Sequence, residues 1–300
     1  MAVRVVTDSS ADLSPAILEE LSIEVAPLMV RFGDEEFRDG IDLTTEAFWA
    51  RLRSSDTMPR TAAPSPGAFA EAYARSIARG ASAIVCVTLS SRVSAAYQAA
   101  QVAAQEIDGR CPIAVVDSLS VSAALGNLCL AAAHRGATGA DLETVVAELE
   151  ELKGRAAFWG AVETLEYLRR NGRIGAARAF LGTALSIRPL LRFDNGMVEA
   201  CGRVSTRRKS LAWLVERLEA DLPVDSVAAF HADAPDIGVL VEMLSARVPD
   251  QRVEISMMGP VVGAHVGPGT VGVAYFVRPR EATTASDRAG SAPGQGTRSP

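Results

Sequence analysis

Hydroxyl and carboxylate side chains gather in four short clusters of this 300-residue chain, each next to a short apolar run or a predicted helix start. In an open parallel sheet, ligands bind outside the carboxyl ends of the strands, where helix N-termini also point. The free amides and partial positive charge of such termini suit a carboxylate or a phosphate. The clusters are Thr7-Asp8-Ser9-Ser10, Thr61 before Ser65-Pro66-Gly67, Ser90-Ser91 with Ser94, and Asp117-Ser118.

Each cluster taken singly is better explained as a helix cap, because Ser and Thr are preferred N-cap residues. Four clusters on the same kind of edge favour a shared binding site instead. The additional candidates that these clusters contribute to a pocket are Ser9, Ser90, Ser91 and Ser118.

A second signal is the segment Pro260–Gly269, in which three glycines and two prolines surround His265. This composition favours a shaped loop whose backbone closely approaches another group. A tight connection between two strands, with His265 exposed to solvent, explains the pattern equally well. Both interpretations stay open at the level of sequence.

Other catalytic and cofactor motifs are absent or misplaced. Gly267–Gly272 fits the G-x-G-x-x-G dinucleotide pattern, but it precedes a predicted strand, whereas the true fingerprint follows a strand and opens a helix. The sequence has neither a phosphate-binding P-loop nor a G-x-S-x-G nucleophile elbow. We expect no metal site, because the three histidines His134, His231 and His265 lack ligand spacing.

The elements that must position these residues alternate between strands and helices in the first half of the chain. The apolar runs Val3–Val6, Ala83–Val87 and Ile113–Val116 predict buried strands. Helices are predicted after Ser14-Pro15, after Ser65-Pro66 and over 142–152. This alternation predicts a parallel sheet with helices on its faces.

The pattern changes after Gly154. Asp194-Asn195-Gly196 predicts a β-hairpin turn, followed by helices at 206–220 and 237–248 and strands at 227–231, 253–257 and 271–277. We therefore predict an α/β fold with an N-terminal Rossmann-like parallel sheet domain at 1–154. An α+β domain with a partly antiparallel sheet is predicted at 155–279, and a disordered tail at 280–300.

The overall composition narrows the class of protein. Apolar residues make up 48% and charged residues 22%, as in ordinary globular proteins. The net charge of −6 argues against a nucleic acid partner, which requires a basic surface. The four cysteines form no C-x-x-C pair, no apolar stretch reaches transmembrane length, and the N-terminal strand is too short for a signal peptide. We therefore predict a cytoplasmic protein without a transmembrane segment.

Six segments, in the family's order, resemble the DegV family across nearly all of residues 2–278. They are Thr7–Leu13, Thr61–Phe69, Leu89–Tyr97, Val116–Ser118, Leu165–Ile174 and Gly259–Gly269. The resemblance implies a two-domain protein that holds a long-chain fatty acid between its domains, with no other cofactor and no catalysis of its own. It also implies a partner, an ATP-binding fatty acid kinase subunit, which phosphorylates the carboxylate of the bound acid.

The same resemblance implies that Thr61, Ser94 and His265 bind the carboxylate, and it gives His265 a candidate role in phosphate transfer. Two hydroxyls, backbone amides and an imidazole can replace the water that a buried carboxylate loses. About fifteen buried methylenes contribute roughly 12 kcal/mol gross at about 0.8 kcal/mol each, before ordering costs. Tight binding would then follow even from a weak head-group site.

Four positions depart from the family pattern. The family commonly has glycine at the position of Arg92, a Gly-Thr pair at Ala95-Ala96 and an arginine at Ser205. Arg203 and Arg207 are the nearby candidates to replace that arginine. If it serves phosphate transfer, the Ser205 departure bears on coupling to a kinase and not on lipid binding.

Two other functions stay open. The fold is distantly similar to the substrate subunit of dihydroxyacetone kinases, in which a histidine captures a small carbonyl compound, and His265 would then be the nucleophile. A hydrolase built from Ser94, His265 and an aspartate such as Asp8 is a third hypothesis, although the nucleophile elbow is missing. A large apolar cavity would favour the fatty acid, and a small polar one the carbonyl compound.

Overall fold

The computed structural model of the protein describes residues 2–107, 109, 111–180 and 187–279. The first half of the chain forms a four-stranded parallel sheet. The strand order is β2-β1-β6-β7. Every residue of β6 is buried, as expected for a parallel strand that is covered on both faces. The four strands are β1 (Val3–Asp8), β2 (Glu24–Ala26), β6 (Ala83–Thr88) and β7 (Ile113–Asp117).

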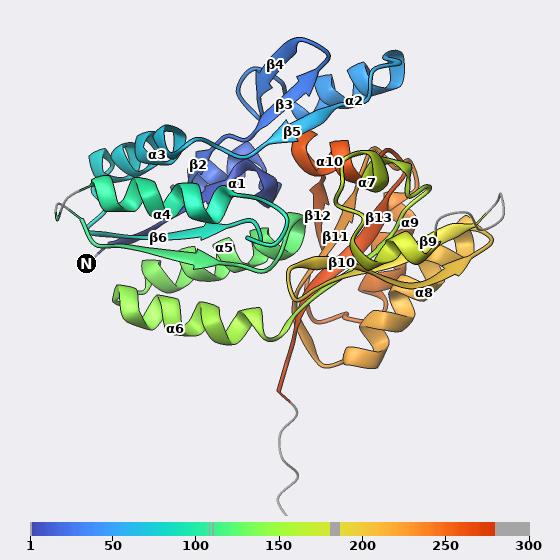
Figure 1. Ribbon diagram of the computed structural model, residues 1–300. Coiled ribbons are helices and arrows are strands. Elements are labelled where there is room, and N and C mark those ends of the chain that lie inside the picture. Colours follow the sequence, from blue (N-terminus) through green and yellow to red (C-terminus); the bar gives the residue numbers. More distant parts are fainter. Residues whose placement is uncertain (1, 108, 110, 181–186, 280–300) are drawn as a thin grey trace, which may run out of the picture.

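Helices cover both faces of this sheet (Figure 1). On one face α3 (Pro66–Ala78) packs against α4 (Ala96–Glu106), and on the other α5 (Ser122–Ala137) packs against α6 (Leu142–Lys153). Ser65 caps α3 and Pro66 occupies its first turn, as the Ser-Pro pair predicted. The alternation of strands and helices in this half therefore has the predicted form.

A six-stranded mixed sheet forms from the second half, with the order β10-β9-β8-β13-β11-β12. Its described pairs are antiparallel except for β11 with β12. Helices α8 (Arg207–Asp221) and α9 (Ile237–Ser245) pack on it, and the Asn195-Gly196 turn joins β9 to β10 as predicted. The strands are β8 (Ala156–Ala161), β9 (Arg188–Asp194), β10 (Met197–Val204), β11 (Val224–His231), β12 (Glu254–Met257) and β13 (Val271–Val277). The predicted fold class is confirmed.

Helix α5 lies between the two sheets. It contacts β1 and β6 on one side and β8, β11 and β13 on the other. A Cβ atom at Gly136 of this helix would lie 2.5 Å from the carbonyl oxygen of Val3, so glycine permits the close approach to β1. The two halves of the chain therefore share one central helix.

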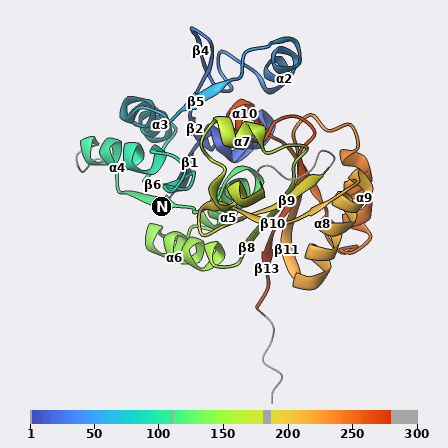
Figure 2. The same ribbon diagram turned by 45° about the vertical axis from the view of Figure 1, so that its right-hand side comes forward.

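A small antiparallel sheet and one helix form a lobe that the sequence patterns did not predict. Its strand order is β4-β3-β5, and strands of three or four residues are too short to show a clear alternation. Both ribbon views show this lobe above the short helix α10 (Figures 1 and 2). The elements of the lobe are β3 (Met29–Phe32), β4 (Glu35–Arg38), β5 (Arg60–Ala62) and α2 (Thr45–Ser54).

The segment around His265 contains a helix, α10 (Pro260–Val266), where we predicted a loop or tight connection. Gly259 takes the N-cap position and Pro260 lies in the first turn, a favourable place for proline. The remaining short elements are η1 (Ser9–Ala11), α1 (Pro15–Glu20), α7 (Glu166–Arg170) and η2 (Gly175–Phe180). The domain division at Gly154 stays a prediction, and the predicted tail at 280–300 lies outside the described residues.

Candidate functional site

A cavity of about 250 Å³ is lined by residues from both halves of the chain. Most of its lining side chains are apolar, and no Asp or Glu belongs to the described lining. The polar and charged residues that line it are Ser10, Thr61, Ser94, Arg173, Arg192, His265 and Thr270. The cavity therefore combines apolar walls with hydroxyl donors and two arginines.

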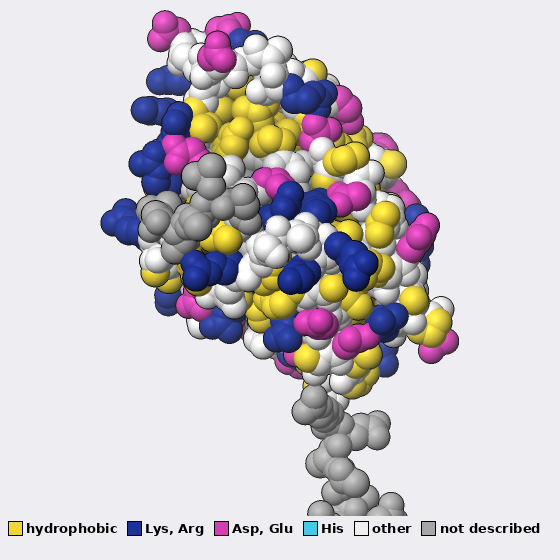
Figure 3. Space-filling view, turned by 90° about the vertical axis from the view of Figure 1, so that its right-hand side faces the viewer, with side chains coloured by type: hydrophobic (Ala, Val, Ile, Leu, Met, Phe, Trp, Pro, Cys, Tyr) yellow, Lys and Arg dark blue, Asp and Glu magenta, His cyan; other side chains and the backbone are white. Residues whose placement is uncertain are grey.

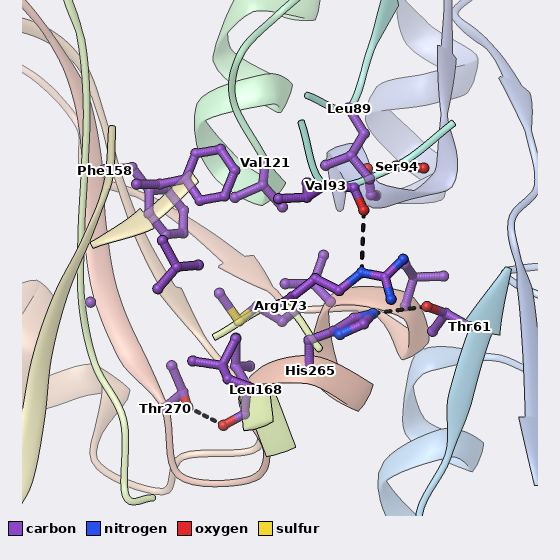
Figure 4. Close-up of a pocket in the computed structure, with 18 of the residues that line it drawn as sticks. Thr61, Leu89, Val93, Ser94, Val121, Phe158, Leu168, Arg173, His265 and Thr270 are labelled. Atoms are coloured by element: carbon purple, nitrogen blue, oxygen red, sulfur yellow. Dashed lines mark hydrogen bonds between the residues drawn. The ribbon is translucent and has the colours of Figure 1, made fainter. Parts of the chain in front are cut away.

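Thr61 and His265 meet at one end of this cavity (Figure 4). Strand β5 presents Thr61, and the last turn of α10 presents His265. The Oγ1 atom of Thr61 lies 2.8 Å from Nε2 of His265, a hydrogen-bonding distance. The fold thus brings together two of the three residues that the family resemblance implied, although they are 204 positions apart.

Ser94 lies at the same end, between β6 and α4 (Figure 4). Its Oγ atom accepts a hydrogen bond from the backbone N–H of Ala96 at 3.2 Å, which is a local bond at the helix start. Among the described residues, no acceptor takes the hydroxyl proton of Ser94. That proton is available to an oxygen of a ligand.

Arg173 is a cation of this site that sequence reasoning did not single out. Its Nε atom donates to the carbonyl oxygen of Val93 at 3.2 Å, and Nη1 donates to that of Asn171 at 2.9 Å. Figure 4 shows its side chain between Val93 and His265. Arg173 forms no ion pair with a described residue, whereas the other lining arginine, Arg192, is paired with carboxylates. Only its place in a segment that resembles the DegV family could have indicated it.

Burial, and to a smaller extent the positive charge of Arg173, lower the pKa of His265 to about 4. The imidazole is therefore neutral at pH 7. Its Nδ1 atom is buried without a partner among the residues that the structure describes. With the proton on Nε2, the ring donates to Thr61 and leaves the threonine hydroxyl proton free for a ligand.

Aromatic rings bound the cavity away from this polar end. Phe158 of β8 stacks on Phe230 of β11 with ring centroids 4.3 Å apart, and Phe193 packs edge-on against Phe158. Figure 4 shows Phe158 across the cavity from Thr61. The cavity therefore runs from a polar end to an apolar end, a polarity that matches an amphiphilic ligand.

The other four pocket candidates lie outside the cavity lining; they are Ser9, Ser90, Ser91 and Ser118. The hydroxyl of Ser90 donates to the backbone at the tip of the β9–β10 hairpin at 2.9 Å, and Ser91 is exposed. The hydroxyl of Ser118 donates to a carbonyl two residues further on, at 3.2 Å. The Oγ atom of Ser9 accepts from the N–H of Leu28 at 3.1 Å. These bonds are the turn and cap interactions that short hydroxyl side chains commonly make.

A hydrolase triad does not assemble here. His265 is bonded to Thr61 rather than to Ser94, and the carboxylate of Asp8 accepts bonds from Ser10 and from a backbone amide. Within the described part of the chain, no group of three His, Cys, Asp or Glu side chains could hold a metal ion.

The two arginines near Ser205 have other surroundings. Arg207 donates to both carboxylate oxygens of Asp236, at 2.8 and 2.7 Å, and also to Glu163 at 3.1 Å. Arg203 is exposed on β10 and does not line the cavity. Neither guanidinium therefore stands in the cavity in place of the family arginine.

The outer surface has mixed charge on the face seen in Figure 3. Basic and acidic side chains alternate over most of this face, and apolar side chains gather in a hollow below the lobe at the top. A continuous basic surface, which nucleic acids require, is not visible there. No helix among the described residues is long and apolar enough to cross a membrane.

Comparison with known proteins links this architecture to one family. The DegV family model, described as a family of uncharacterised proteins, matches residues 2–278. A DegV domain-containing protein of Streptomyces coelicolor is 38% identical over 282 residues, covering 92% of this chain and 99% of that protein.

Two solved structures are similar over almost their whole length. A DegV family protein from Thermus thermophilus, described for its fatty acid binding, has 32% identity and a TM-score of 0.84, with 93% of this chain and 100% of that chain covered. DegV of Bacillus subtilis, described as a fatty acid binding protein, has 30% identity and a TM-score of 0.83, with 93% and 100% covered.

Proposed function

The chain belongs to the DegV family, and from this premise we propose that it binds a long-chain fatty acid, with the carboxylate at Thr61, Ser94 and His265. The observation that carries the proposal is the polarity of the cavity: apolar walls, one polar end with an unpaired arginine, and no acidic side chain in the described lining. An anionic head group on an apolar chain fits both parts. The fatty acid binding described for the two solved relatives supports the same ligand.

The polar end supplies the donors that a carboxylate needs. The hydroxyls of Thr61 and Ser94 each have a proton to donate, and Arg173 adds a positive charge. Hydrogen bonds to a charged group contribute about 1.5–3 kcal/mol each, and a buried carboxylate is costly without them. In this arrangement neutral His265 orients the Thr61 hydroxyl toward the ligand.

The apolar walls favour a long chain over a small polar substrate. Each methylene that leaves water contributes about 0.8 kcal/mol, so the chain supplies most of the affinity. In the alternative reading, His265 would attack a small carbonyl compound, but its Nε2 atom is engaged by Thr61 and its Nδ1 atom is buried. Few polar groups in the lining would hold such a compound.

We further propose that the protein has no catalysis of its own and presents the carboxylate, in the cytoplasm, to a separate ATP-dependent kinase subunit for acyl-phosphate formation. Arg173 is exposed, so the polar end of the cavity adjoins the protein surface. A partner could therefore reach the carboxylate while the chain stays buried.

The ligand is tested by organic extraction of the purified protein followed by mass spectrometry. We expect about one acyl chain per protein molecule, and delipidated protein should bind added palmitate or oleate. The proposal is wrong if no stoichiometric acyl species is extracted and neither acid binds.

The presentation step is tested with His265→Ala, the cognate kinase subunit and ATP. We expect acyl-phosphate formation to fall more than acid affinity, because the Thr61 hydroxyl that His265 orients would donate to the charge that develops in the transition state, and such a bond acts on rate. His134→Ala, at an exposed position near the end of α5, is the matched control and should change neither quantity. Equal losses of rate and affinity would make His265 a binding residue only.

A further inference from the structure

Helix α10 carries His265 but is too short to fix its own position. It has seven residues, with Gly263 in its middle and Gly267 at its end. Isolated helices of this length are unstable in water, and glycine lowers helix stability further. The place of His265 must therefore be set by what holds α10 from outside.

Two acidic residues from the first half of the chain hold the start of α10. Asp12 Oδ1 accepts a hydrogen bond at 2.8 Å from the N–H of the N-cap residue, and the carboxyl group of Asp39 lies beside the N–H of Val261. The hydroxyl of Ser122 donates to Asp12, and the hydroxyl of Ser9 lies beside the carboxyl group of Asp39. The hydroxyl of Ser9, a pocket candidate by sequence, therefore supports this contact.

The middle and the end of α10 also contact the first half of the chain. A Cβ atom at Gly263 would lie 2.7 Å from ring atoms of both Phe48 and Trp49, so these rings pack directly on the helix backbone. The indole N–H of Trp49 donates to the carbonyl oxygen of Met258 at 3.0 Å. At the far end, His265 meets Thr61.

We propose that Asp12 and Asp39 are positioning residues of the carboxylate site: they hold the first turn of α10 and so set where His265 stands opposite Thr61. The ligand named in this inference rests on the proposed function, but the positioning itself does not. A neutral acceptor such as Asn or Ser would suffice for capping alone. Asp39 is only 5% exposed, and its Oδ2 atom has no partner among the described residues. Burying this acidic side chain therefore lowers the stability of the folded protein.

The test compares Asp39→Ala with Asp39→Asn. Asparagine keeps an oxygen that can accept from Val261, whereas alanine removes it. Asp42→Asn is the matched control, because Asp42 lies nearby but bonds only to exposed Arg38. The first readout is the ratio of palmitate affinity to hexadecanol affinity. The second is the ¹⁵N signal of His265 Nε2 in ligand-free protein, which reports the bond to Thr61.

We expect Asp39→Ala to lower the acid-to-alcohol ratio by about tenfold, the size of one lost charge-assisted bond, and to shift the His265 signal. Asp39→Asn should restore both, and Asp42→Asn should change neither. A folded Asp39→Ala protein with a wild-type ratio and signal would overturn the inference, because a purely stabilising residue gives that result.

Ser9→Ala provides a milder variant in case Asp39→Ala does not fold. It removes the hydroxyl beside Asp39 and, with it, the bond that this hydroxyl accepts from the N–H of Leu28, while the carboxyl group of Asp39 stays in place. A smaller shift of the His265 signal is therefore expected, and an unchanged signal would count against the inference. If the wild type binds neither palmitate nor hexadecanol, the proposed function fails, while the His265 signal still decides the positioning.

Discussion

Arg173 and His265 share one end of the cavity, and the guanidinium affects the charge state of the imidazole. Burial keeps His265 neutral, and the guanidinium reinforces this, so the positive charge for a carboxylate comes from Arg173 alone. A neutral imidazole beside a permanent cation is well suited to orient the Thr61 hydroxyl without losing a proton to the ligand.

Replacing Arg173 should therefore raise the pKa of His265. In Arg173→Ala we expect the imidazole to titrate above its wild-type pKa of about 4, yet still below its ordinary value because burial remains. Histidine NMR titration measures this directly. Arg178→Ala, an exposed residue outside the cavity lining, serves as the control. An unchanged titration in Arg173→Ala would show that the charge of Arg173 does not lower the pKa of His265.

The hydroxyls of Thr61 and Ser94 should distinguish acid from alcohol. We expect Thr61→Ala combined with Ser94→Ala to weaken palmitate binding more than hexadecanol binding, because charge-assisted bonds are worth roughly 1.5–3 kcal/mol each. A displacement titration with both ligands measures the difference. Equal losses for the two ligands would contradict the assignment of these hydroxyls to a carboxylate.

For single residues, the sequence predicts which side chains are candidates for the site better than it predicts what those side chains contact. Thr61, Ser94 and His265 were indicated by family motifs, and the fold brings them to one end of a cavity. Ser90 and Ser118 carry the same hydroxyl at the same kind of strand end, but bond to nearby backbone. Local sequence cannot separate these cases, because a hydroxyl suits a turn and a ligand equally well.

Helix α10 shows how an element depends on partners that are distant in sequence. Glycine inside a helix normally costs stability, so the composition of Pro260–Gly269 predicts a shaped loop or a tight connection between strands rather than a helix. Packing against the lobe formed by β3, β4, β5 and α2 offsets this loss of helix stability. The rings of Phe48 and Trp49 in α2 lie so close to Gly263 that a larger residue would overlap them. Such a contact between segments about 200 residues apart leaves no periodic pattern in either of them.

Two glycine substitutions should therefore have opposite effects on stability. Gly263→Ala should lower the free energy of unfolding by about 1–3 kcal/mol, because the added methyl overlaps the rings of Phe48 and Trp49. Gly238→Ala in α9, where a Cβ atom meets nothing within 4 Å, should raise it by about 0.5–1 kcal/mol. Urea denaturation of both variants measures the pair. Stabilisation by Gly263→Ala would show that α10 is not packed this tightly.

Across the whole molecule, the two halves meet at buried acids as well as at the cavity. Burial raises the pKa of Asp12 to about 8 and that of Asp39 to about 7, both above the ordinary value of 3.8. A raised carboxyl pKa means that the folded protein binds protons more tightly than the unfolded chain. The resulting stability is fully present below pH 4 and is lost as the pH rises through 7 to 8.

The combined variant Asp12→Asn and Asp39→Asn should remove this pH dependence. Between pH 4 and 8 we expect the wild type to lose several kcal/mol of stability relative to the variant, because each carboxyl group that stays protonated only in the folded state contributes about 1.4 kcal/mol per pH unit. Urea denaturation at a series of pH values gives the comparison, in which the titration of His265 is common to both proteins. Parallel profiles would mean that the two carboxyl groups are not protonated in the folded state.

The division into a parallel and a mixed sheet was accessible from the sequence, because β1, β6 and β13 contain short apolar runs and Asn195-Gly196 is a strong turn signal. How the halves join was not, since α5 serves both sheets and an Ala-rich helix looks alike whether one or both sides are buried. The cavity arises at this junction, so its shape depends on tertiary packing rather than on any single segment.

The central claim is that a fatty acid lies in the cavity with its carboxylate at Thr61, Ser94 and His265. NMR of palmitate labelled with ¹³C at the carboxyl carbon tests it most directly. We predict one bound carboxyl signal that stays ionised to lower pH than the free acid, because Arg173 and two hydroxyls favour the charged form. In Thr61→Ala this signal should move and its pKa should rise. A bound signal that titrates like free palmitate, and is unchanged in Thr61→Ala, would contradict the account.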